Sequence, residues 1–210
     1  VAHKVVSKAE GRVRRLAEIE PGRDAQALAA QHGKDPRLVQ AVLDEAEEVV
    51  RAGHGVLIAR TRHGFVCANA GVDQSNAAGA DELVLLPEDC DASARGLRSA
   101  VAAARGVRPA VVITDSFGRA WRLGQVDVAI GAAGLLALDD WRGRPDAAGR
   151  ELRVTTIAVA DALAAAADLA RAKDSREPAV LVRGLERFVT REDGPGAVAL
   201  RRPRELDLFP

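Results

Sequence analysis

The order of strand-like and helix-like segments along the chain restricts its fold to one class. Short β-branched or apolar runs typical of strands occur at residues 1–6, 55–60, 65–68, 82–86, 110–114, 151–160, 179–182 and 188–190. Patterns typical of helices lie between them, at residues 36–52, 91–104 and 161–172. The two kinds of segment do not alternate regularly. We therefore predict an α+β fold with mixed sheets and packed helices.

The composition describes an ordinary globular protein and excludes several classes of partner. With 210 residues, of which 48% are apolar, the chain is long enough for one domain spanning residues 1–210. Its 30 basic and 30 acidic residues cancel, so no overall field attracts nucleic acid or an anionic membrane. The longest apolar runs, such as residues 162–167, fall far short of the roughly 20 residues of a membrane span. We expect a cytoplasmic protein with no nucleic-acid or membrane partner.

The first residues of the sequence are already strand-like. Its first residue is Val1, the sequence holds no methionine, and strand-like residues begin at once. No signal peptide is recognisable there. We expect that an N-terminal segment, containing a first strand or loop, is missing.

Polar residues that suit phosphate or metal binding gather in three segments, although neither a GxGxxG nor a GxxxxGK[ST] motif is present. In the first, residues 7–11, Lys8 could direct a point charge at a phosphate, or the segment could be a solvated turn. In the second, residues 69–79, Asp73 offers hard oxygen ligands for Mg²⁺ or Mn²⁺, and Asn76 offers an amide to a base or phosphate. The alternative is a surface loop with Asx-type turns.

The third segment, residues 114–122, follows a buried-type strand. That strand would deliver Asp115 and Ser116 at its carboxyl end, and a carboxylate beside a hydroxyl can hold a phosphate-bound metal. Arg119 and Arg122, three residues apart, suit phosphate clamping; the alternative is a capped loop with its arginines paired to surface acids. Together the three segments predict a metal–phosphate site that acts by positioning and charge neutralisation.

Five stretches of the chain resemble, in order, those of the coenzyme F420:L-glutamate ligase family, the gamma-glutamyl ligases. These stretches are KVVSKAEGR (4–12), RHGFVCANAGVDQSN (62–76), LLPEDCDASA (85–94), ITDSFGRAWRLGQ (113–125) and IAVADALAAAADLA (157–170). Under this resemblance, Asp73 matches a metal-binding aspartate and Asn76 a nucleotide contact. Asp115 and Ser116 match an Asp–Thr pair that holds metal, with serine keeping the hydroxyl.

The resemblance also implies residues that bind GTP. Lys8 matches a GTP-contacting lysine, and His3 occupies a position that touches GTP. Arg119 and Arg122 are assigned to catalysis and to phosphate or substrate binding from their chemistry rather than from a family match. Lys173 stands where the family often has a glycine followed by an amide or acid; because a lysine cannot ligate a cation, we predict that it replaces the charge of a second metal.

The reaction that the resemblance implies is GTP-dependent ligation of L-glutamate to the lactyl-phospho deazaflavin precursor of coenzyme F420, through an acyl phosphate. GTP is then a cosubstrate, Mg²⁺ or Mn²⁺ the metal, and a monovalent cation a further candidate cofactor. The family's unusual fold implies an intertwined homodimer. Two alternatives stay open: a non-catalytic module that binds GTP or deazaflavin, which would have no need to keep Asp73 and Asp115, and an amide ligase with a different acceptor.

Overall fold

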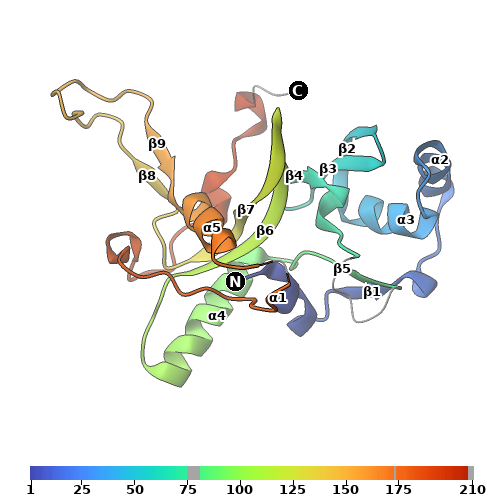
Figure 1. The fold of residues 1–210 in the computed structure, drawn as a ribbon, viewed down its shortest axis with the longest axis horizontal. Coiled ribbons are helices and arrows are strands. Elements are labelled where there is room, and N and C mark those ends of the chain that lie inside the picture. Colours follow the sequence, from blue (N-terminus) through green and yellow to red (C-terminus); the bar gives the residue numbers. More distant parts are fainter. Residues whose placement is uncertain (75–80, 173, 208–210) are drawn as a thin grey trace. The chain divides into compact units, whose positions relative to one another are not determined.

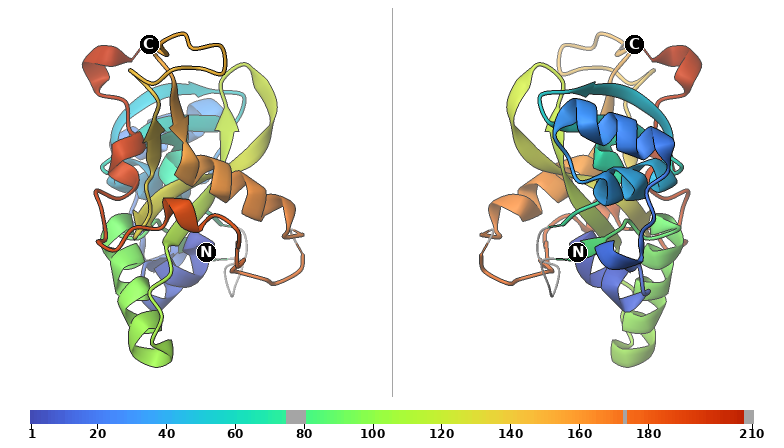
Figure 2. Two further views of the ribbon diagram at one scale, coloured as in Figure 1. Left: turned by 90° about the vertical axis from the view of Figure 1, so that its left-hand side faces the viewer. Right: turned by 90° about the vertical axis from the view of Figure 1, so that its right-hand side faces the viewer.

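A computed structural model describes residues 1–74, 81–172 and 174–207 (Figure 1). The chain divides into two compact units. We call residues 3–88 and 117–125 the N-terminal unit, and residues 1–2, 89–116 and 126–210 the C-terminal unit. Both contain helices and small sheets (Figure 2), which confirms the predicted α+β class.

The N-terminal unit packs helices against a small antiparallel sheet. Its elements are α1 (His3–Ala9), β1 (Val13–Arg15), η1 (Leu16–Glu18), α2 (Arg23–His32), α3 (Pro36–Glu45), β2 (Ala46–Gly53), β3 (Val56–Thr61), β4 (Val66–Ala68), η2 (Asn69–Gly71) and β5 (Glu82–Val84). Strands β2, β3 and β4 form one sheet, and β1 pairs with β5. Buried side chains of α2, α3 and β3 form the core with apolar residues next to β1, β4 and β5.

The first segment of this unit is a helix, so the strand predicted at residues 1–6 is wrong. Ala2 makes a single parallel bridge to Thr114. Helix α1 then begins at His3 and buries Val6 and Ser7. Because β-branched residues lower helix propensity only slightly, burial of one helix face decides the conformation here.

The helix predicted over residues 36–52 is also shorter than expected. It ends at Glu45, and the remaining residues form β2. The turn from β2 to β3 consists of His54 and Gly55, whose φ angles are 51° and 72°. Two positive φ angles are those of the tight turn that hairpins favour. Pairing with β3 therefore outweighs the helical spacing by which Ala46 and Val49 continue the pattern of α3.

The C-terminal unit surrounds a long hairpin with two helices and irregular segments. Its elements are α4 (Cys90–Arg105), β6 (Val111–Arg119), β7 (Arg122–Ala133), β8 (Leu138–Asp140), β9 (Thr156–Ala158), α5 (Val159–Leu169), η3 (Glu186–Phe188), η4 (Ala197–Leu200) and η5 (Arg204–Leu206). Strands β8 and β9 form the base of an arm that extends away from α5 (Figure 1). Across both units, no described helix has the length and apolar character needed to cross a membrane.

Two sequence predictions for this part of the chain are wrong. The strand predicted at residues 110–114 does not end there, because residues 115–125 form the end of β6, a turn and the start of β7. The late strands expected at residues 179–182 and 188–190 are absent from the described residues; Val189 makes only an isolated bridge to Leu135. Local composition predicted these segments wrongly because a segment becomes a strand only where the tertiary structure provides a partner strand.

The first turn of helix α4 contains a buried carboxyl side chain, that of Asp91. Asp89 caps the helix by accepting the Ala92 N–H at 2.8 Å. Asp91 instead accepts backbone N–H groups from two distant segments, those of Ala132 at 2.8 Å and Ala197 at 2.7 Å. These bonds fix β7 and η4 to the start of α4.

Arg98 lies two turns further along the same helix and is only 1% exposed. Its guanidinium donates to Asp193 Oδ1 at 2.5 Å, to the Thr190 carbonyl at 2.6 Å and to the Pro109 carbonyl at 3.0 Å. A buried guanidinium is tolerated when its N–H groups are satisfied in this way. Arg98 therefore ties the C-terminal segment to α4.

We expect Arg98→Met to destabilise the protein by about 3 kcal/mol, at the lower end of the range for breaking a buried ion pair, because Asp193 is one-third exposed and can be hydrated. The change in the free energy of unfolding is measured by following the unfolding of the C-terminal unit in chemical denaturant. Arg95→Met is the matched control: Arg95 is on the same helix, 39% exposed and 3.7 Å from Asp89, and its loss should cost about 0.5 kcal/mol or less. Equal effects of the two substitutions would contradict the role given to Arg98.

Candidate functional site

The predicted site residues fall into groups that the structure describes separately. His3, Lys8 and Asp73 belong to the N-terminal unit, and Asp115 and Ser116 to the C-terminal unit. Arg119 and Arg122 lie near the turn of the β6–β7 hairpin, among the residues that cluster with the N-terminal unit. Asn76 and Lys173 lie outside the described residues.

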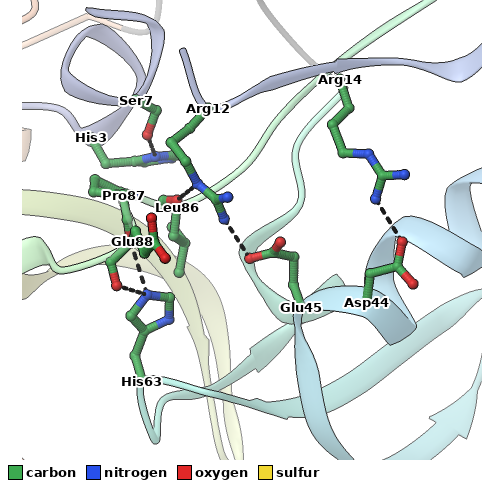
Figure 3. A network of polar contacts seen from close by, with 10 residues as sticks. All are labelled: His3, Ser7, Arg12, Arg14, Asp44, Glu45, His63, Leu86, Pro87 and Glu88. Atoms are coloured by element: carbon green, nitrogen blue, oxygen red, sulfur yellow. Dashed lines mark hydrogen bonds and ion pairs between the residues drawn. The ribbon is translucent and has the colours of Figure 1, made fainter. Parts of the chain in front are cut away.

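In the N-terminal unit, α1 contributes one buried and one exposed candidate. The His3 ring is 2% exposed, and its Nδ1 lies 3.2 Å from Ser7 Oγ, one helical turn away (Figure 3). Lys8 lies in the last turn of α1 and is exposed. A lysine at this position can reach an anion in solvent, whereas His3 is part of the packing that fixes α1.

Backbone hydrogen bonds hold Asp73 in place, and its carboxylate forms an ion pair with a lysine. Its N–H and carbonyl exchange hydrogen bonds with Val84 at 2.9 and 2.8 Å, which align the segment with β5. Its Oδ2 lies 2.6 Å from Lys4 Nζ, in an ion pair whose side chains are 31% and 25% exposed. Sequence reasoning missed Lys4, which α1 places beside a loop residue about 70 positions away. The carboxylate is thus in an environment that already accommodates positive charge.

The segment that leads to Asp73 has an uncommon backbone conformation. Asn69, Ala70 and Gly71 have φ angles of 51°, 51° and 73°. Such angles cost the non-glycine residues of order 1–3 kcal/mol each, and strain of this kind is concentrated at functional sites. In addition, Asn69 Oδ1 is buried and has no hydrogen-bond partner among the residues described. Gly71 also packs closely, since an added Cβ would lie 2.6 Å from Leu86 Cγ.

A polar network supports the same region, from the residue before β1 and from the turn between β3 and β4 (Figure 3). Arg12, the last residue of the first matching stretch, donates to the Leu86 carbonyl at 2.9 Å and to Glu45 Oε2 at 2.7 Å. His63 Nε2 lies 2.9 Å from the Pro87 carbonyl and 3.1 Å from that of Glu88. Apart from the Arg12–Glu45 pair, these contacts join side chains to the backbone around residues 86–88, so Arg12 and His63 have structural roles here.

In the C-terminal unit, β6 and β7 bring a second carboxylate to the predicted Asp–Ser pair. Asp115 Oδ1 accepts the Ser116 N–H at 2.8 Å, which orients the Asp115 side chain. Ser116 Oγ donates to Asp127 Oδ1 at 2.6 Å, and Thr114 Oγ1 donates to Asp127 Oδ2 at 2.7 Å. Asp127 was not predicted, although an acid between two valines of an apolar strand is a sign of a buried and paired carboxylate.

An arginine from a third segment of the chain forms an ion pair with Asp127. Arg171, just after α5, donates to Asp127 Oδ2 and lies 3.4 Å from Thr114 Oγ1. The ion pair is well buried, with Arg171 10% and Asp127 4% exposed. Forty-four positions separate the two residues, so no local pattern in the sequence could indicate the pair. Nearby, Asp161 accepts the Ala129 N–H at 2.9 Å, and its burial raises the pKa of its carboxyl.

The donor sets fit a magnesium-type cation. Mg²⁺ commonly binds one or two protein carboxylates together with substrate phosphates and water. Asp73 in one unit, and Asp115 with Ser116 in the other, are oxygen donors of this kind. Within the described ranges, no group of three or more His, Cys, Asp or Glu side chains gathers to hold a metal alone. Each of these donor sets, taken by itself, therefore suits a cation that also binds a phosphate ligand.

The hairpin turn presents the two predicted arginines to solvent. Arg119 Nη2 donates to the Leu123 carbonyl at 2.8 Å, which closes the turn. Arg122 is exposed, and so are Trp121 and Leu123. Because a guanidinium has five N–H donors, Arg119 can close the turn and still bind an anion.

Comparison with known proteins identifies the family. The model of the F420-0:Gamma-glutamyl ligase family matches residues 1–184. The chain belongs to this ligase family. It is similar to proteins named coenzyme F420:L-glutamate ligase from Methanopyrus kandleri, with 49% identity over the whole chain and 83% of the relative, and from Methanothermobacter thermautotrophicus, with 47% identity over the whole chain and 82% of the relative. A third such protein, from Methanocaldococcus jannaschii, is 43% identical over the whole chain, and the matched region is 82% of that relative.

All the predicted site residues lie within the part that the ligase family model matches. The resemblance stated from the five stretches is therefore confirmed as membership of the family. The roles of individual residues stay predictions.

We expect Gly71→Ala to destabilise the fold and to shift the Asp73 segment, because it adds both backbone strain and a collision with Leu86. The loss should be about 2–4 kcal/mol, the sum of roughly 1 kcal/mol for the left-handed conformation and 1–3 kcal/mol for overpacking. Thermal unfolding measures it. Gly55→Ala, at the nearly equal φ of 72° but with nothing within 4 Å of the added Cβ, isolates the strain and should cost about 1 kcal/mol. A Leu86→Ala change should recover part of the loss in Gly71→Ala; no recovery would exclude the collision.

Proposed function

We propose that this chain adds L-glutamate to the lactyl-phospho deazaflavin precursor of coenzyme F420 in a GTP-dependent reaction. The observation that carries the proposal is identity of 47–49% along the whole chain to two proteins named coenzyme F420:L-glutamate ligase. Residues in both units have the chemistry that phosphoryl transfer requires, which is oxygen donors for a cation and exposed basic side chains.

The proposed reaction has two steps. In the first, an oxygen of the acceptor's lactyl carboxylate takes the γ-phosphoryl group of GTP; the bond to the β-phosphate breaks, and GDP leaves. In the second, the amino nitrogen of glutamate attacks the acyl carbon, phosphate departs with the bridging oxygen, and the nitrogen loses a proton to give the amide. Charge builds up on phosphate oxygens in the first step, so basic side chains and a cation would lower its barrier.

Oxygen donors in each unit are the proposed metal ligands. Asp73 and Asp115 are the proposed carboxylate ligands, and Ser116 a hydroxyl ligand; bound Mg²⁺ or Mn²⁺ would neutralise phosphate charge. Lys4 shares the carboxylate of Asp73, so a cation there would compete with the ammonium for the same oxygens. A monovalent cation as a second ion stays part of the proposal.

Exposed basic side chains would contact the phosphates. Lys8 at the end of α1, and Arg119 and Arg122 at the hairpin turn, are placed in solvent where a nucleotide or acceptor phosphate can approach. Asn76 is proposed as a nucleotide contact, and Lys173 as a positive charge in place of a second metal. His3 is buried, so we propose that its part in GTP binding is to fix α1 through Ser7.

Oligomeric state is a separate part of the proposal. An intertwined homodimer is expected from the family resemblance. Light scattering coupled to size exclusion measures the mass of the particle in solution, and a value equal to one chain would contradict the dimer.

The decisive experiment is ligation by the purified protein, with GTP, L-glutamate, the deazaflavin acceptor and Mg²⁺ or Mn²⁺. We expect mass spectrometry to show an acceptor heavier by one or more glutamyl residues. Asp73→Asn and Asp115→Asn should each lower the rate by roughly 100-fold or more, the scale of losing one preorganised electrostatic group. Asp24→Asn, on the exposed face of α2, is the control and should leave the rate unchanged.

The other outcomes distinguish the alternatives. GTP bound but no glutamate transferred to any acceptor would indicate a binding module. Glutamate transferred to another carboxylate, but not to the deazaflavin precursor, would indicate an amide ligase with a different acceptor. Full activity in Asp73→Asn and Asp115→Asn would remove both carboxylates from the proposed metal site.

A further inference from the structure

Asp127 determines how the Ser116 hydroxyl can bind a ligand. A serine hydroxyl has one proton to donate and two lone pairs to accept with. In the C-terminal unit, Ser116 Oγ donates that proton to Asp127 Oδ1 at 2.6 Å. While this bond is in place, any further group that binds Ser116 Oγ must use its lone pairs. A cation meets this requirement, and a phosphate oxygen, which needs a donated proton, does not.

The surroundings of Asp127 keep its carboxylate in that role. The side chain is 4% exposed, Thr114 Oγ1 donates to the other oxygen at 2.7 Å, and Arg171 donates to that oxygen as well. An ionised carboxylate at such depth requires paired charge and hydrogen bonds, and Arg171 and Thr114 supply both. Ionised Asp127 can only accept, so the proton on Ser116 Oγ is directed towards it.

We infer that Asp127 is a positioning residue, which makes Ser116 a cation ligand rather than a phosphate donor. This inference rests on the proposed function for the identity of the cation, Mg²⁺ or Mn²⁺. A carboxylate behind a ligating group also raises the basicity of that ligand, and removing such partners typically lowers metal affinity by about 10–100-fold. Arg171 couples the segment after α5 to the same carboxylate, so the position of that segment and the state of Ser116 are linked.

Mn²⁺ binding, measured by electron paramagnetic resonance on the full chain without acceptor, tests the inference independently of ligation. We expect Asp127→Asn to weaken Mn²⁺ binding by about 10–100-fold. We expect Ser116→Ala to weaken it to a similar degree and Ser116→Thr, which keeps the hydroxyl, to retain it. The double variant Asp127→Asn/Ser116→Ala should bind no worse than Ser116→Ala, because Asp127 acts through Ser116.

Thr114→Val is the matched control, since it removes the other hydroxyl bound to Asp127 and leaves the Ser116–Asp127 bond. Its Mn²⁺ affinity should stay within about 3-fold of wild type, below the range expected for losing a partner of a metal ligand. Unfolding curves in denaturant report whether each variant is folded. If Asp127→Asn does not fold, Ser116→Ala and Ser116→Thr decide the question.

Wild-type Mn²⁺ affinity in Ser116→Ala would overturn the inference, as would additive losses in the double variant. Additive losses would mean that Asp127 only stabilises the hairpin. Failure of the proposed function is distinguishable from both, because it would leave the Mn²⁺ results as expected while no glutamate is transferred in the presence of Mn²⁺.

Discussion

One face of α4 carries a buried carboxylate and a buried guanidinium, and the C-terminal unit is arranged around them. Asp91 and Arg98, seven residues apart, lie on the same side of the helix and bind backbone groups of β7, η4 and the segment at residues 190–193. The packing there is close: an added Cβ on Gly131 would lie 2.2 Å from the Cys90 carbonyl oxygen. Since buried ions are stable only when fully bonded, this face permits little displacement of the segments that it holds.

The predicted pair of Asp115 and Ser116 depends on that arrangement through β7. Asp127 lies on the same strand as Ala132, whose N–H is bound by Asp91. The hairpin then sets Asp127 opposite Thr114 and Ser116 of β6, where their hydroxyls can donate to it. A helix that contributes no predicted site residue thus fixes the geometry around Asp115 and Ser116. In the N-terminal unit, the pairing of Asp73 with Val84 and the left-handed turn before it have the equivalent role.

Several features could be predicted from local sequence because their causes are local. Asp35 and Pro36 predict the start of α3, and Gly106, with a φ of 68°, ends α4 as expected of a helix-terminal glycine. Incorrect predictions arose where partners are distant. Ala46 and Val49 continue the helical spacing of Leu38 and Val42 but pair with β3. Residues 1–6 look like a strand, but residues from His3 onward form a helix because one face is buried.

For the site, the sequence by itself determined the residue types and their grouping: Asp73 in a Gly/Asn-rich segment, and Asp115 with Ser116 directly after an apolar run. It also determined family membership, because the matching stretches occur in order along nearly the whole chain. The tertiary structure alone decided which partner each of these side chains has. Lys4 with Asp73, and Asp127 with Ser116 and Arg171, are contacts between residues 11 to about 70 positions apart. Such contacts depend on helix burial and strand register, which no local pattern encodes, and they determine whether a hydroxyl donates a proton or offers lone pairs.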